Sequence, residues 1–182
     1  MFRSIRRRSG RPHPSDADSH AEDPLKWHLN LITELAKVVR PVVYVELGVH
    51  RAELFNRVMP YAEQRFGVDI DPAAADYIEK TPKSRFYCGT TSSFVEEFRA
   101  SGLAIDMLFI DADHCRESVL RDFRDYFPFV RPHGLILLHD THPGDASLLD
   151  YGQCGDESRA AGEIQRDLRG VELISRPFSP GL

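Results

Sequence analysis

The sequence predicts an α/β protein with a doubly wound, Rossmann-like, mostly parallel sheet and helices on both faces. Three observations support this prediction: β-rich apolar runs alternate with helical patterns, the connections are short, and the run Ile105–Ile110 is almost entirely apolar. A strand that is apolar on both sides is typical of the interior of a parallel sheet. Right-handed crossovers between such strands build a doubly wound sheet.

Length and composition favour one modest domain. The chain has 182 residues, of which 42% are hydrophobic and 28% are charged, and this is enough apolar material for one core. The net charge of -5 argues against nucleic acid as a partner, because phosphate binding needs a concentrated basic face. Three cysteines without a paired CxxC spacing argue against a disulfide framework and favour the reducing cytoplasm.

Residues 1–23 are rich in arginine at the start and poor in apolar residues throughout. We expect them to form a disordered basic leader; the alternative is an arm that binds an anionic membrane or nucleic acid. The segment lacks the apolar core of a secretory signal, and no run in the chain approaches membrane-spanning length. We therefore expect the folded domain to cover residues 24–182 without membrane contact.

Proline positions and the spacing of apolar residues predict the first elements. Pro24 suits the first turn of a helix, whose apolar residues recur at helical spacing until Pro41. The β-branched run at 42–46 is a strand, and residues 52–62 read as the next helix.

The middle of the chain continues this alternation of strands and helices. We expect strands at 65–70 and 84–88, a helix at 73–80 capped by Asp71, and a helix that follows the turn at 89–93 and runs through Arg99.

The last part begins with the apolar strand at 105–110. We expect a helix at 116–130 closed by 131–134, a strand at 135–138, a long loop at 141–157, a helix at 158–168 and a strand at 171–175. The chain leaves little room for a final antiparallel strand, and an uncovered sheet edge favours homo-oligomerisation.

Acidic residues follow two of these strands. Asp111 ends the run at 107–111, and the pair His139-Asp140 follows the run at 135–138. Open α/β sheets bind ligands at the carboxyl ends of their strands, so these residues predict one shared site.

The loop after the first strand also points to a ligand. Glu46 places a carboxylate there and Gly48 allows a tight turn, although an ordinary strand-to-helix turn would look similar. A GxGxxG fingerprint is absent, because His50 and Glu53 stand where glycines are needed, which disfavours NAD and FAD. Asp69, about twenty residues beyond, suits the hydroxyls of a ribose.

Four motifs resemble, in order, those of class I S-adenosylmethionine (SAM)-dependent methyltransferases, in particular the small-molecule O-methyltransferases related to macrocin O-methyltransferase and cephalosporin hydroxylase-like proteins. The motifs are at 44–48, 66–72, 109–114 and 130–141. The resemblance implies a SAM site in which Glu46 and Gly48 line the methionine end, Asp69 holds the ribose, Thr90, Thr91 and Ser92 border the adenine, and Asp111 faces the transferred methyl group.

The same resemblance extends to metal-assisted catechol-type enzymes and implies that Asp111, His139 and Asp140 hold a divalent ion. A nitrogen ligand at position 139 suits a softer metal better than magnesium. His114, three residues beyond Asp111, is then suited to act as a general base together with Asp111 in catalysis. The expected acceptor is the hydroxyl of a small metabolite, such as a sugar, glycoside or phenol.

Other interpretations remain open. His114 could be a surface or capping histidine, and His139 could bind only backbone groups. A metal-independent methyltransferase and a non-catalytic SAM-binding module are the competing functions.

Overall fold

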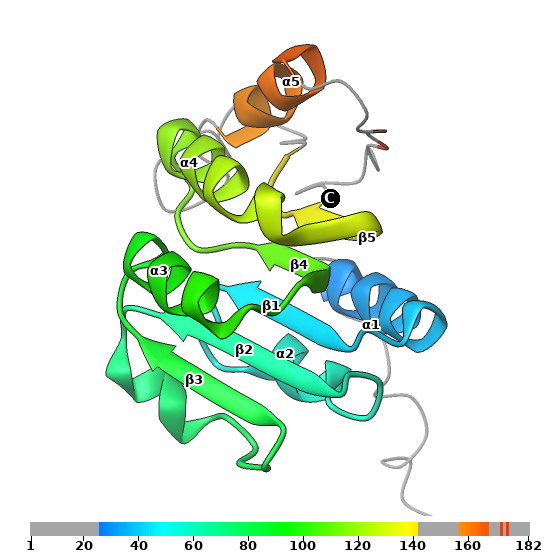
Figure 1. Cartoon of the computed structure of the whole chain (residues 1–182), viewed down its shortest axis with the longest axis vertical. Helices are drawn as coiled ribbons and strands as arrows, with labels where there is room; N and C mark the ends of the chain where they lie inside the picture. The colour runs from blue at the N-terminus through cyan, green and yellow to red at the C-terminus, as the bar shows by residue number, and fades with distance from the viewer. Residues whose placement is uncertain (1–25, 142–156, 168–171, 173, 175–182) are drawn as a thin grey trace, which may run out of the picture.

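Five parallel strands form one sheet in the computed structural model, which describes residues 26–141 and 157–167 together with Glu172 and Ile174 (Figure 1). The strand order is β3-β2-β1-β4-β5, and every pairing is parallel. The strands are β1 (Val43–Leu47), β2 (Gln64–Asp69), β3 (Ser84–Cys88), β4 (Ile105–Ile110) and β5 (Val130–Leu138). The helices are α1 (Trp27–Val39), α2 (Glu53–Val58), η2 (Pro72–Asp76), α3 (Thr91–Ser101), α4 (Arg116–Tyr126), η3 (Phe127–Phe129) and α5 (Glu157–Asp167).

Helices cover both faces of the sheet, as the sequence predicts. One hydrophobic cluster joins α3, α4 and α5 to one face, and a second cluster joins α1 and α2 to the other. The strand β1 is buried along its whole length, which explains its run of apolar residues. The doubly wound fold is thus confirmed.

Several expected elements differ from the structure. The helix expected at 52–62 is the shorter α2, which ends at Val58, and α3 begins at Thr91, inside the turn expected at 89–93. The helix predicted at 73–80 is the short 3-10 helix η2; its cap is as expected, since Asp71 accepts a hydrogen bond from the backbone N–H of Ala73. The helix predicted to reach residue 130 ends at Tyr126, because η3 contains Pro128, and β5 already begins at Val130. The prediction of a closing turn at 131–134 was therefore wrong: these residues form an irregular start of β5, with a register shift against β4.

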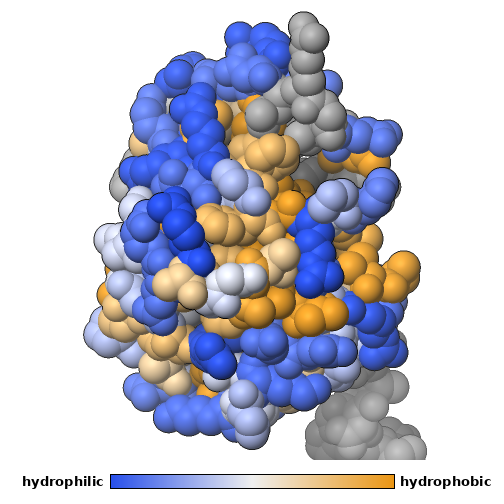
Figure 2. Space-filling view, viewed as in Figure 1, coloured by the Kyte–Doolittle hydropathy of each residue, from blue (hydrophilic) through white to orange (hydrophobic). Residues whose placement is uncertain are grey.

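The edge of the sheet at β5 carries no further strand among the described residues. Leu135, Ile136 and Leu137 are only partly buried there. Figure 2 shows hydrophobic residues across the middle of the molecular surface, with hydrophilic residues above and below. Homo-oligomerisation through this edge stays a prediction.

Several expectations fall on residues outside the described ranges. These are the leader at 1–23 and nearly all of the loop at 141–157. In the strand expected at 171–175 only Glu172 and Ile174 are described, and neither belongs to a strand. Among the described residues, no helix combines the length and the apolar character needed to cross a membrane.

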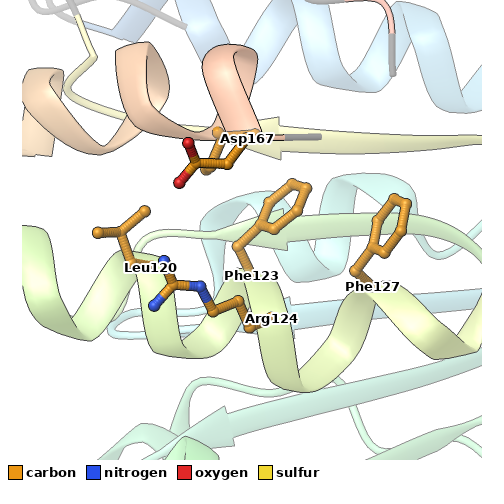
Figure 3. A pocket seen from close by; sticks show the side chains of 6 residues that line it. Leu120, Phe123, Arg124, Phe127 and Asp167 are labelled. Atoms are coloured by element: carbon orange, nitrogen blue, oxygen red, sulfur yellow. The ribbon is translucent and has the colours of Figure 1, made fainter. Parts of the chain in front are cut away.

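A small cavity lies between α4 and α5. Its volume is about 180 Å³, and it is lined by Leu120, Phe123, Arg124, Phe127, Ile164 and Asp167 (Figure 3). Ligand pockets usually measure about 300–1,000 Å³. The cavity also lies on the opposite face of the sheet from α1. The predicted site residues lie elsewhere, at the carboxyl ends of the strands.

Candidate active site

The pleat of the sheet directs three of the predicted site residues to the same face. Side chains alternate between the two faces of a strand. Glu46, Asp111 and His139 each come two residues after a side chain that packs on the α1 and α2 side of the sheet, namely Tyr44, Phe109 and Leu137. The strands β1, β4 and β5 are adjacent and parallel. The three side chains therefore lie at the carboxyl ends of these strands, on the face that α1 and α2 cover.

Asp111, His139 and Asp140 form a compact cluster. Nδ1 of His139 lies 3.1 Å from Oδ1 of Asp111 and 3.2 Å from Oδ1 of Asp140. Asp140 has a φ of 53°, a left-handed conformation in which the backbone turns sharply after β5. Of the described residues, these three are the set whose ligand atoms could jointly hold a metal ion, since one atom from each lies within 4.8 Å of the others.

The donor set fits a divalent ion in chemistry and in spacing. Two carboxylates and an imidazole suit a first-row transition metal. With bonds of about 2.0–2.1 Å, neighbouring ligand atoms of an octahedral site are about 3 Å apart, close to the 3.1 and 3.2 Å distances that His139 makes with the two carboxylates.

The carboxylates and histidines of this cluster shift one another's pKa values. Burial would lower the pKa of His139, but hydrogen bonds with Asp111 and Asp140 outweigh this effect and raise it to about 10. Burial would likewise raise the pKa of Asp140, but its contacts with His114 and His139 hold it well below its usual range. Without a metal, a protonated His139 therefore occupies the place between the two carboxylates.

His114 joins the cluster through Asp140. Its Nδ1 lies 2.7 Å from Oδ2 of Asp140, and its side chain is 31% exposed. The nearby carboxylate of Asp140 raises the pKa of His114. One carboxylate oxygen of Asp140 thus contacts His139 and the other contacts His114. Asp140 can therefore orient the imidazole of His114 for proton transfer.

The loop after β1 is fixed to its neighbours by Gly48 and Asp69. Gly48 has a φ of +88°, and a Cβ at this position would lie 2.1 Å from the carbonyl oxygen of Asp111, so only glycine fits. The Asp69 carboxylate accepts hydrogen bonds from the backbone N–H groups of His50 at 2.7 Å and Asp71 at 2.9 Å. Asp69 therefore ties the β1 loop to the end of β2, and both of its oxygens retain lone pairs for a further donor.

Glu46 is buried beside the metal-ligand candidates. It is 2% exposed, and its Oε2 accepts a hydrogen bond of 2.6 Å from the hydroxyl of Tyr44. Burial is the main cause that raises the pKa of Glu46 to about 8, and the nearby Asp111 adds to it. At neutral pH the carboxyl is mostly protonated, and an adjacent cation would favour its ionised form.

The sequence model of a family described as "Methyltransferase domain" matches residues 45–141. This range is more than half of the chain and runs from β1 to the end of the Asp111, His139 and Asp140 cluster. The chain belongs to this methyltransferase family.

Solved structures share the fold of this methyltransferase domain. The O-methyltransferase TomG from Streptomyces achromogenes, in complex with SAM, is 14% identical with a TM-score of 0.65; the match covers 78% of this chain and 69% of TomG. An O-methyltransferase from Bacillus cereus, in complex with S-adenosylhomocysteine (SAH), is 13% identical with a TM-score of 0.65, covering 82% and 73%. MycE from the mycinamycin biosynthetic pathway, in complex with Mg and SAH, is 20% identical with a TM-score of 0.57, covering 77% and 42%. No curated protein matches the sequence.

The residues expected near the adenine occupy the start of α3 in the methyltransferase domain. Thr90 caps this helix, since its hydroxyl accepts from the backbone N–H of Ser93. Thr91 is buried and donates to Asp122 of α4 at 2.7 Å. Ser92 is half-buried. The hydroxyls of Thr90 and Thr91 thus already form hydrogen bonds with protein groups. Of the three, the Ser92 hydroxyl has no hydrogen-bond partner among the described residues.

One member of the cluster was not assigned to the site from sequence. His28, in the first turn of α1, places its Nδ1 3.2 Å from Nε2 of His139. Helical spacing alone cannot show which strand end a helix faces, so no pattern in the sequence placed His28 beside His139. The only sequence signal was a histidine in the first turn of the helix that precedes β1.

Proposed function

We propose that this methyltransferase domain transfers a methyl group from SAM to a hydroxyl of a small metabolite, with the help of a divalent metal ion held by Asp111, His139 and Asp140. The observation that carries the proposal is the convergence of these three residues and His114 at the carboxyl ends of β4 and β5. This edge of the sheet lies within the part of the chain that matches the methyltransferase family.

Several features of the β1 and β2 ends suit SAM. The buried Glu46 carboxyl would face the ammonium group of the methionine end, beside the turn at Gly48. The carboxylate of Asp69 would accept from the ribose hydroxyls, and the next residue, Ile70, is 74% exposed, an apolar surface of the kind that an adenine ring covers. The complexes of TomG with SAM and of the Bacillus cereus enzyme with SAH support this assignment.

The residues of the chain supply positioning and proton transfer. SAM, when bound, supplies an electrophilic methyl group, and the acceptor oxygen must lie in line behind it. A divalent ion, when bound, would lower the pKa of the acceptor hydroxyl. His114, oriented by the carboxylate of Asp140 at 2.7 Å, would accept the hydroxyl proton. Asp111 and Asp140 would keep their negative charge toward the ion.

For the acceptor we propose a sugar, glycoside or phenol, within the branch related to macrocin O-methyltransferase. The four sequence motifs at 44–48, 66–72, 109–114 and 130–141 support this branch. The fold likeness to MycE adds to it, because that protein has been solved with Mg, SAH and mycinamycin VI. A metal site next to a histidine base suits a neutral hydroxyl, whose proton must leave before or during methyl transfer.

One observation favours a second candidate, a metal-independent methyltransferase. His139 already lies between Asp111 and Asp140 and neutralises part of their charge. In that case Asp140 and His114 would form the base without an ion, and Asp111 would bind the substrate directly.

A methyl-transfer assay separates these candidates. The purified protein is incubated with SAM labelled in its methyl group and a panel of sugars, glycosides and phenols, with EDTA or with added magnesium or manganese. We expect a labelled methyl ether that disappears with EDTA and returns with the metal. Transfer that is indifferent to EDTA would support the metal-independent enzyme, and SAH binding without transfer to any acceptor would support a non-catalytic module.

A further inference from the structure

His28 is held against the metal-ligand candidates by the packing of α1. Leu29, Ile32 and Ala36 of this helix are buried in the cluster that covers the sheet. The rings of His28 and His139 are 4.1 Å apart between centroids and tilted by 52°. The ring of Trp27 is edge-on to that of His28, with ring centroids 6.5 Å apart. The packing of α1 therefore places the imidazole of His28 at the end of β5.

The two ring nitrogens of His139 have different partners. Its Nδ1 lies within 3.2 Å of both Asp111 and Asp140, and its Nε2 lies 3.2 Å from Nδ1 of His28. A histidine that binds a metal through Nδ1 carries its proton on Nε2, and this N–H needs an acceptor. The Nδ1 atom of His28 is placed to be that acceptor, which requires His28 to carry its own proton on Nε2.

We propose that His28 is a positioning residue: it accepts a hydrogen bond from Nε2–H of His139 and so holds Nδ1 of His139 toward Asp111 and Asp140 as the third ligand of the divalent ion. This inference rests on the proposed metal-assisted function. It assigns the N-terminal helix a role in the metal site, although His28 and His139 are 111 positions apart in the chain.

Manganese binding to the full chain tests the role of His28. The affinity for Mn²⁺ is measured by calorimetry for the wild type, His28→Phe and His28→Asn. Loss of an outer partner of a metal ligand typically costs roughly 10–100-fold in metal affinity. We expect such a loss in His28→Phe, which keeps a ring but removes the acceptor, and recovery to within a few-fold in His28→Asn, whose amide oxygen can replace Nδ1.

A matched control is His133→Phe, which removes an exposed histidine near the opposite end of β5. It should leave Mn²⁺ affinity unchanged. Wild-type affinity in His28→Phe would overturn the role of His28 alone. The absence of Mn²⁺ binding by the wild type would instead overturn the metal-assisted function, and the role of His28 with it.

A second measurement does not depend on the folding of any variant. In the metal-free wild type, ¹⁵N NMR of the imidazoles should detect a scalar coupling across the hydrogen bond from Nε2–H of His139 to Nδ1 of His28. The absence of this coupling in the folded protein would also overturn the proposal.

Discussion

Oδ1 of Asp111 lies 3.1 Å from Nδ1 of His139, although the two residues are 28 positions apart in the chain. They meet because β4 and β5 are adjacent and parallel, with Ile110 paired to Leu138, so the residue after each strand reaches the same edge. The backbone N–H of His139 also donates to the carbonyl of Ile110 at 3.2 Å. The candidate metal site is thus a direct consequence of sheet register.

Removing one carboxylate of the site should stop catalysis and spare cofactor binding. We expect Asp111→Asn and Asp140→Asn each to lower methyl transfer by at least about 100-fold, with SAH affinity within a few-fold of wild type. Turnover and calorimetry measure the two effects. Asp167→Asn, an exposed aspartate at the end of α5, is the control; retained activity in both site variants would remove the carboxylates from the mechanism.

Gly48 should tolerate no side chain. Gly48→Ala adds a Cβ at 2.1 Å from the carbonyl oxygen of Asp111, whereas Gly102, with a φ of +67°, has nothing within 4 Å of the added atom. Gly102→Ala therefore reports backbone strain alone, about 1–2 kcal/mol, and Gly48→Ala should cost clearly more. Urea unfolding measures both, and equal costs would contradict the close approach seen at Gly48.

Asp122 should make stability depend on pH. It is 2% exposed, and burial raises its pKa to about 6 despite the hydrogen bond from Thr91. Because the folded pKa lies above the ordinary value of 3.8, the fold favours the protonated acid. This contribution is complete below pH 4 and is lost as the pH rises through 6.

The variant Asp122→Asn isolates this effect. Its free energy of unfolding relative to wild type should increase between pH 4 and pH 7 by up to about 3 kcal/mol, the equivalent of the shift. Denaturant unfolding at several pH values gives this difference. A difference that stays constant over this range would show that folding does not raise the pKa of Asp122.

Cofactor binding should release a proton from Glu46. Its carboxyl, with a pKa of about 8, is mostly protonated at pH 7, and the ammonium group of SAH would favour the carboxylate. The calorimetric enthalpy at pH 7 should therefore vary with the ionisation enthalpy of the buffer, and this variation should vanish in Glu46→Gln. An enthalpy that is independent of the buffer in the wild type would argue against contact between Glu46 and the ammonium group.

Strands with clear sequence signals were the easiest part to predict. The bounds of β3 and β4 match the predicted ranges, because turn residues delimit β3 and the run of β4 is almost entirely apolar. The beginning of β5 was missed, because Pro132 and Gly134 look like a turn in sequence. An irregular strand, at the edge among the described residues, accommodates both.

The site was predictable where it depends on strand ends and not where it depends on helix packing. Asp111, His139 and Asp140 follow strands whose parallel order brings them together, and the structure does so. The contact of His28 with His139 depends on how α1 lies across the sheet, which no local pattern encodes. The partner of Thr91 on α4 is hidden for the same reason.

Calorimetric titration of the purified chain with SAH, with EDTA or with magnesium or manganese added back, tests the central claim most directly. We predict micromolar binding of SAH that Asp69→Ala weakens, because the ribose loses its acceptor. No binding of SAH under any of these conditions would contradict the proposed methyltransferase activity.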